Sequence, residues 1–212
     1  MKRRFVVQLW AAAAVMAAGS FAPLARAADE APDAMIKRLS DEVMAAIKAD
    51  KSVQSGDMAK VMGLVDSKIM PSVNFQRMTA AAVGPAWRQA TPEQQKRLQD
   101  EFKVLLVRTY SGALAQVNDQ VINTKPLRAA PTDTDVLVRT EVRGRGDPIQ
   151  LDYRLEKTSG EGAGWKIYNL NVLGVWLVET YRSQFASEIN AKGLDGLIAS
   201  LSERNKSNAK KG

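Results

Sequence analysis

The residue types on which most enzymes and metal sites depend are missing from this sequence. It contains no cysteine and no histidine. That composition excludes thiolate and imidazole metal sites, cysteine nucleophiles and triads in which histidine is the base. Disulfides are excluded too, so the folded state must depend on its apolar core for stability.

The glycine-rich and acidic segments that remain are typical of turns. Gly160, Gly162 and Gly164 lie between two expected strands, whereas a phosphate-binding loop follows a strand and opens a helix. Asp133 and Asp135 are spaced like calcium ligands, but the glycine and the distal acid of an EF-hand loop are missing. Neither segment therefore predicts a site.

Three further acids, Asp147, Asp152 and Glu156, are the candidates for a pair of catalytic carboxylates. Asp152 and Glu156 alternate with apolar residues, so we expect both on the solvated face of a strand. We therefore predict no catalytic residue, no metal site and no cofactor.

The start of the chain has the three parts of a secretory signal peptide. Lys2, Arg3 and Arg4 precede a largely apolar stretch over residues 5–24, and Ala25-Arg26-Ala27 follows it. We expect cleavage after Ala27 and export. Gln8, Gly19 and Ser20 interrupt this stretch, so its uninterrupted apolar core is shorter than the roughly 20 residues that a membrane span prefers.

Cleavage changes the charge of the chain and the partners expected for it. The removed segment carries four cations and no acid, so the net charge of +7 falls to +3. Export and this modest charge argue against nucleic acid as a partner. We expect residues 28–205 to form a single domain and residues 206–212 a basic, disordered tail.

Helical periodicity dominates the first half and the end of the chain. Apolar residues recur at spacings of three and four over 29–50, 57–70 and 177–201, and Gly193 is expected to end a helix within the last range. Thr91, Pro92 and Gln94 form a capping box that opens a long helix. The apolar stripe of that helix consists of Leu98, Phe102, Leu105, Leu106, Thr109 and Ala113.

The period changes to two after Asn118. Alternating residues predict four strands, over about 121–127, 136–142, 149–156 and 165–172, separated by turns rich in glycine, proline and aspartate. We therefore predict an α+β fold with N-terminal helices, a four-stranded curved antiparallel sheet and C-terminal helices. Helices packed on the concave face of such a sheet can leave an apolar cavity, although periodicity alone favours a packed core.

Three segments together resemble the MlaC family, the periplasmic phospholipid-binding component of the Mla lipid-transport system, also called toluene-tolerance proteins. They are Met78–Thr91, continuing into Pro92–Gln95; Phe102–Tyr110; and Val172–Phe185, with Tyr181-Arg182-Ser183-Gln184-Phe185, followed by Asn190–Leu197. These segments occur in the family's order and cover most of the mature chain.

The resemblance implies a periplasmic, monomeric phospholipid carrier without catalytic activity. It implies that acyl chains lie in the cavity between sheet and helices. It also implies exchange of lipid with an outer-membrane lipoprotein–porin complex and with an inner-membrane ABC transporter, which maintains the lipid asymmetry of the outer membrane.

The apolar residues on facing elements are the candidates for contact with the acyl chains, and some are expected to be ordinary core. They are Phe75, Met78, Phe102, Leu105, Leu106, Tyr110, Val136, Val138, Ile149, Leu151, Tyr153, Leu170, Val172, Leu177, Tyr181 and Phe185. Arg143 and Arg145 are weaker candidates for the headgroup phosphate, because exposed arginines are more often simply solvated.

Two departures from the family pattern bear on the ligand. Trp176 stands where the family leads us to expect a small residue such as serine, and a bulky indole there could narrow or reshape the cavity. Gln116-Val117-Asn118 lacks an aromatic residue expected near the end of the long helix. Three alternatives therefore stay open: a binding protein for another apolar ligand such as a hopanoid, an enzyme on the same scaffold, and a structural adaptor with a filled core.

Overall fold

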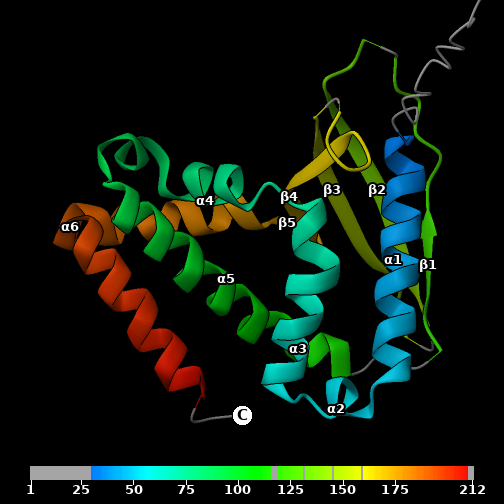
Figure 1. Ribbon diagram of the computed structural model, residues 1–212, viewed down its shortest axis with the longest axis horizontal. Coiled ribbons are helices and arrows are strands. Elements are labelled where there is room, and N and C mark those ends of the chain that lie inside the picture. Colours follow the sequence, from blue (N-terminus) through cyan, green and yellow to red (C-terminus); the bar gives the residue numbers. More distant parts are fainter. Residues whose placement is uncertain (1–29, 116–118, 131, 145, 159, 210–212) are drawn as a thin grey trace, which may run out of the picture.

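The computed structural model describes residues 30–115, 119–130, 132–144, 146–158 and 160–209 (Figure 1). The expected signal peptide, the segment Gln116–Asn118 and the candidate headgroup residue Arg145 lie outside these ranges. No helix within the described ranges is long and apolar enough to cross a membrane.

The first helix, α1 (Pro32–Ala49), has proline in its first turn, where the missing N–H has no helical partner to lose. Its apolar period buries Met35, Ile36, Leu39 and Ile47, each less than 10% exposed. The predicted helix over 29–50 is therefore confirmed. Met35, Ile36 and Leu39 pack on the sheet.

The short helices α2 (Lys51–Gln54) and α3 (Met58–Leu64) are capped by aspartates. The Asp50 carboxylate accepts a hydrogen bond from the backbone N–H of Ser52, and that of Asp57 accepts from Ala59 and Lys60. The helix predicted to run from Asp57 to Met70 continues as a π-helical turn, η1 (Val65–Ile69), and ends in the 3₁₀ turn η2 (Met70–Ser72).

The long helix α5 (Pro92–Ala115) begins as predicted. The backbone N–H of Gln94 donates to the Thr91 hydroxyl at 3.2 Å, and the backbone N–H of Thr91 donates to the Gln94 side chain at 3.0 Å. These two bonds form the expected capping box. Before it lie α4 (Phe75–Val83) and the 3₁₀ helix η3 (Gly84–Gln89).

The sheet is an antiparallel meander of five strands, β1 (Val121–Thr124), β2 (Asp135–Arg143), β3 (Ile149–Lys157), β4 (Trp165–Val172) and β5 (Val175–Trp176). The prediction of four strands is therefore wrong by one. Strand β5 is only two residues long, and a tight turn at Leu173 and Gly174, with φ of +52° and +86°, joins it to β4. Leucine rarely adopts this conformation, so the turn could not be recognised from residue type.

The chain ends in α6 (Leu177–Ala209), which is two helices joined at Gly193. Gly193 has φ of +69° and lies where the sequence predicted the end of a helix. The helix continues to Ala209, past Lys206, where the sequence analysis placed the start of a disordered tail.

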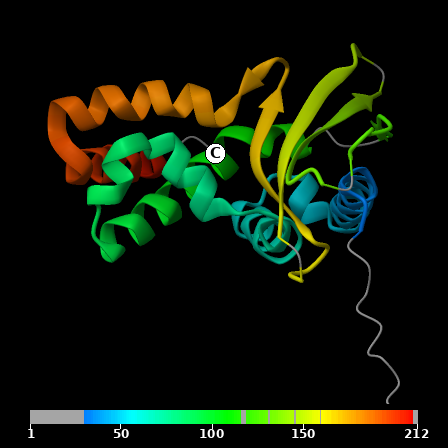
Figure 2. The same ribbon diagram turned by 90° about the horizontal axis from the view of Figure 1, so that it is seen from above.

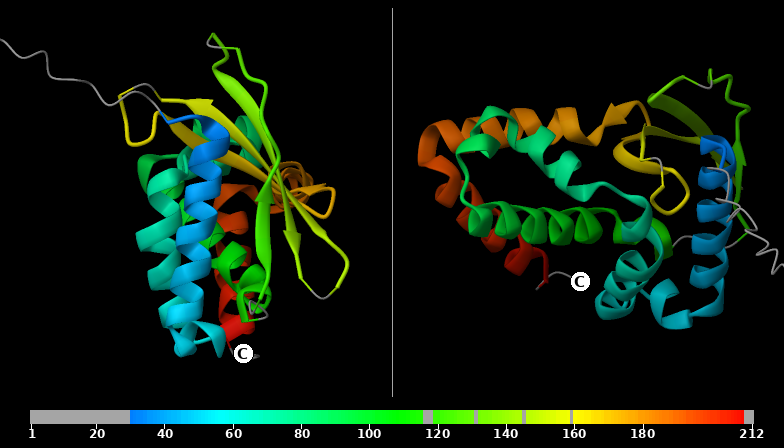
Figure 3. Two further views of the ribbon diagram at one scale, coloured as in Figure 1. Left: turned by 90° about the vertical axis from the view of Figure 1, so that its right-hand side faces the viewer. Right: turned by 45° about the horizontal axis from the view of Figure 1, so that its top comes forward.

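The molecule is elongated, with the sheet and α1 at one end and α4, α5 and α6 at the other (Figure 1). Helix α1 stands against one face of the sheet, and α4 runs beside the first half of α6 (Figures 2 and 3). We expected the helices to form one layer over the sheet, and this is wrong. The apolar core is divided instead.

Two parts of that divided core are large. The helical cluster is centred on α4, α5 and α6. The sheet cluster joins α1 to β2, β3 and β4. A third, smaller cluster, Ile47, Val53, Val61 and Leu64, ties α1 to α2 and α3.

Candidate functional site

Most residues on the inner face of the sheet are apolar, although Thr140, opposite Leu151, is buried among them. The pairing of Val138 with Tyr153, and of Tyr153 with Leu170, puts alternate residues of three strands on this face. A register shift between Arg154 and Leu155 keeps Ile167 on the same face. The sheet therefore presents a largely apolar surface on this side.

Protein covers one end of this face completely. Val138 and Leu155 are fully buried there, and Val136 and Ile167 are nearly so, because α1 packs on them with Met35, Ile36 and Leu39. This end is ordinary close-packed core.

The other end of the face is left half-buried, although its residues are equally apolar. We call the four residues Leu151, Tyr153, Leu170 and Val172 the inner strip; all are partly exposed. Tyr153 packs against the sheet cluster, whereas Leu170 and Val172 pack against the helical cluster. The inner strip therefore bridges the two clusters and is closed by neither.

Exposure increases toward the edge of the inner strip. Ile149 of β3 is 41% exposed and Val175 of β5, which pairs with Val172, is 50% exposed. Tyr110 of α5 is 36% exposed, and Leu106, one helical turn before it, is half-buried. Exposed large apolar side chains are typical of a surface that binds an apolar partner.

The helical cluster, by contrast, is filled by its own side chains. The ring of Phe102, fully buried, lies 4.9 Å from that of Tyr181 and 5.2 Å from that of Phe185, centroid to centroid, both in edge-on geometry. Phe75 adds a fourth ring at 5.8 Å. Such contacts are those of a packed aromatic core.

The polar groups inside the candidate site are neutral. Burial raises the pKa of Tyr153, opposed by hydrogen bonds with Thr140 and Ser40. Burial also raises the pKa of Tyr181, opposed by a hydrogen bond with Thr109, and that of Tyr110. All three phenols therefore stay protonated near neutral pH, and they add no charge to the apolar surface.

The sixteen residues proposed from the sequence are thus distributed over three environments. Phe75, Met78, Phe102, Leu105, Leu177, Tyr181 and Phe185 are buried in the helical cluster, with Leu106, Leu170 and Val172 at its edge. Val136 and Val138 are buried in the sheet cluster, with Tyr153 at its edge. Leu151 is half-buried, and Ile149 and Tyr110 are exposed.

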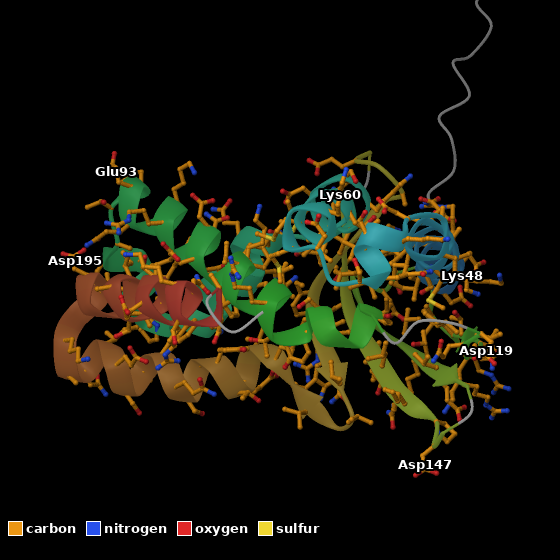
Figure 4. The ribbon with its side chains drawn as sticks, turned by 90° about the horizontal axis from the view of Figure 1, so that it is seen from below. Lys48, Lys60, Glu93, Asp119, Asp147 and Asp195 are labelled. Carbon is orange, nitrogen blue, oxygen red and sulfur yellow. The ribbon has the colours of Figure 1, made fainter. Side chains whose placement is uncertain are left out.

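The acids considered as a catalytic pair are not placed as the sequence predicted. Asp152 is only 5% exposed, not solvated: it lies on a central strand opposite Asn171, which is also buried. Its carboxylate accepts a hydrogen bond from the Gln150 side chain at 2.7 Å. Glu156 binds Asn74 and Arg77, while Asp147 lies exposed beyond the end of β2 (Figure 4).

Trp176 lies on the outer face of the sheet. It pairs with Asn171, which pairs with Asp152, and its ring lies 4.2 Å from the Arg154 guanidinium. Its indole therefore lies on the face opposite that of Leu170 and Val172. Arg143 is exposed and forms an ion pair with Glu141 at 3.2 Å.

Two surface pockets were not foreseen from the sequence. One, of about 960 Å³, lies between the α2–α3 turn, α5 and the end of α6. The other, of about 430 Å³, lies between α4, η3 and α6. None of the sixteen proposed residues lines either pocket. Over the described part of the chain, no group of acidic residues is arranged to hold a metal ion.

The sequence of this chain is similar to those of known proteins. A sequence model of one family, described as MlaC protein, matches residues 37–203. The toluene tolerance protein ttg2D of Pseudomonas putida is 26% identical over 174 residues, 82% of this chain and 80% of that protein. The intermembrane phospholipid transport system binding protein MlaC of Haemophilus influenzae is 22% identical over 178 residues, 83% of each chain.

A solved structure is also similar. It is that of a phospholipid-binding protein from Ralstonia solanacearum in complex with a phospholipid. Its TM-score is 0.80 and its sequence identity 49%, over 84% of this chain and 98% of that chain.

Two leucines on the inner face of β3 provide a matched test of whether the inner strip is core. Leu155→Ala should lower the free energy of unfolding by about 2–5 kcal/mol, because Leu155 is fully buried. Leu151→Ala should lower it by about 1 kcal/mol or less, because its side chain is already partly exposed. Urea denaturation of protein freed of apolar ligands measures both values. Equal losses would show that the inner strip is ordinary core.

Proposed function

Because this chain belongs to the MlaC family, we propose that it is a phospholipid carrier that holds acyl chains on the inner strip. As a monomer in the periplasm, it exchanges lipid with an outer-membrane lipoprotein–porin complex and with an inner-membrane ABC transporter. Export follows from the signal peptide proposed for residues 1–27. The carrier needs no catalytic group.

One observation carries the proposal: inward-facing apolar residues that the protein itself does not cover. Leu151, Tyr153, Leu170 and Val172 lie on the inner face of the sheet and are half-buried between two closed clusters. The Ralstonia solanacearum relative, 49% identical, binds a phospholipid, which supports a hydrocarbon chain as the missing cover. The wholly buried rings around Phe102 then form the wall behind the chain.

Burial of hydrocarbon supplies the affinity. Each methylene removed from water contributes roughly 0.8 kcal/mol, so two chains of about 16 carbons would nominally gain about 25 kcal/mol. That value exceeds the practical ceiling of about 18–21 kcal/mol for noncovalent binding. A bilayer buries the same chains equally well, so a carrier needs only an affinity comparable with that of the membrane.

The headgroup lies at the open edge, near the exposed Ile149 and Val175, and stays in water. The inner strip and its neighbouring tyrosines carry no charge, so little discrimination among headgroups is expected. Arg143 stays a weak candidate for the phosphate, because Glu141 already neutralises its guanidinium. Arg145, which lies outside the described residues, also stays a weak candidate for the phosphate.

Release requires the helices to move relative to the sheet, and polar contacts on the outer face oppose that movement. Glu179 of α6 accepts hydrogen bonds from Arg154 of β3 at 2.7 Å and from Asn169 of β4 at 2.8 Å. Asn74 and Arg77, at the start of α4, bind Glu156 of β3. Docking on a partner that weakens these contacts would open the site.

Loss of one such contact should accelerate lipid transfer. Glu179→Gln removes the ion pair with Arg154, whose groups are partly exposed, and pairs of this kind contribute about 0.2–1 kcal/mol. Transfer of a fluorescent phospholipid to acceptor vesicles should therefore quicken by up to about fivefold. Glu203→Gln, an exposed position on the same helix, is the control. Equal rates in both variants and the wild type would contradict this account of release.

Native mass spectrometry of the mature protein, purified from the periplasm without detergent, tests the carrier directly. We expect a bound mass equal to that of a phospholipid. Val172→Trp should reduce the bound lipid at least about fivefold, because the indole fills the inner strip where lipid would lie. Val121→Trp makes the same change at an exposed position of β1 and should leave the load unaltered.

The other outcomes of this experiment identify the alternatives. The mass of a hopanoid or another isoprenoid would indicate a carrier for a different apolar ligand. Protein without any bound molecule would favour a structural adaptor. An unchanged lipid load in Val172→Trp would move the binding site away from the inner strip.

A further inference from the structure

The smaller surface pocket, about 430 Å³, lies where two segments distant in sequence meet. Helix α4 and the turn η3 supply all of its lining residues except Arg182 of α6. Helix α4 runs beside the first half of α6 (Figures 2 and 3). No residue of the inner strip takes part in it. Its chemistry can therefore be considered independently of the lipid.

The floor of this pocket is small and apolar. Ala80 and Ala81 leave α4 without bulk on this side, and Pro85 and Trp87 of η3 complete the lining. Gly84 turns the chain between them with φ of +72°, a conformation that favours glycine. The side chains present leave room for an apolar group of a ligand.

Three arginines line the pocket, and they differ in what they bind. Arg77 is occupied: it pairs with Glu156 and Asp135, and its guanidinium stacks on Tyr168. Arg88 and Arg182 are exposed and have no ion pair or side-chain hydrogen bond within the described ranges. No acidic residue lines the pocket. It therefore combines an apolar floor with two uncompensated positive charges.

The side chains of Arg88 and Arg182 make no hydrogen bond or ion pair that would stabilise the described part of the fold. Their neighbours in sequence do stabilise it: Tyr181 and Phe185 fill the helical cluster, and Trp87 packs against it. Each arginine belongs to a segment that carried the family resemblance, Met78–Thr91 for one and Val172–Phe185 for the other. Folding brings these otherwise unused cations to a single pocket.

We propose that this pocket is the docking site for an acidic segment of a protein partner. Two carboxylates of such a segment pair with Arg88 and Arg182, and an apolar side chain between them enters the floor beside Trp87. A free phosphate would leave the floor empty. A flat anionic bilayer would not reach into a concave site. A peptide that combines acidic and apolar side chains satisfies both parts of the lining.

A selection experiment tests this proposal without knowledge of the partner. A random peptide library is selected on the immobilised full-length mature protein, and the affinity of the enriched peptides is measured by fluorescence anisotropy. We expect the enriched sequences to carry clustered Asp and Glu beside a large apolar residue. Their binding should weaken at least about tenfold in the double variant Arg88→Glu, Arg182→Glu, because attraction becomes repulsion.

A matched control separates local from overall charge. The double variant Lys125→Glu, Arg128→Glu changes the net charge by the same amount at two exposed positions outside the pocket. It should alter the affinity by less than about twofold, since distant exposed charges are screened. Native mass spectrometry should show an unchanged lipid load in all variants. Failure of docking is thereby distinguishable from failure of the carrier function.

Three results would overturn the proposal. The first is a selection without acidic enrichment. The second is equal peptide binding by the wild type and the double variant. The third is binding of the wild type, but not the double variant, to vesicles containing anionic phospholipid while the peptides fail, which would assign the arginines to a membrane surface.

Discussion

The rest of this structure depends on one constraint: the apolar face of the sheet extends beyond the part of it that the helices bury. At the α1 end, Val138 and Leu155 are completely buried. At the other end, Leu151 and Val172 face inward and remain partly exposed. Exposed apolar area costs roughly 25 cal/mol per Å², so a hydrocarbon ligand gains affinity from surface that folding leaves open.

The division of the core explains how one fold can hold lipid and still be stable. The helical cluster around Phe102 and the sheet cluster around Val138 are each closed by their own side chains, so an empty inner strip need not unfold the protein. Polar contacts at Glu156 and Glu179 hold the two parts together from the outer face. Recognition of a partner at Arg88 and Arg182 would use a third region, so binding and docking are spatially separate.

Local signals in the sequence predicted most elements but not their arrangement. Thr91 and Gln94 are sufficient to place the start of α5, because a capping box needs only four residues. Strand β5 was missed because a leucine occupies a left-handed turn position. The burial of Asp152 was missed because alternation along β3 places its side chain on the outer face but does not reveal what packs there. Apolar type alone could not separate Leu151 from Leu155, since their difference in burial arises from distant α1.

Nuclear Overhauser contacts between a bound phospholipid and labelled methyl groups test the central claim most directly. In lipid-loaded protein with ¹³C-labelled leucine and valine methyls, acyl methylene protons should contact Leu151, Leu170 and Val172 of the inner strip. Leu155, on the same face of the same sheet but fully buried, should show none. Contacts absent from all three residues, or concentrated elsewhere, would contradict the account.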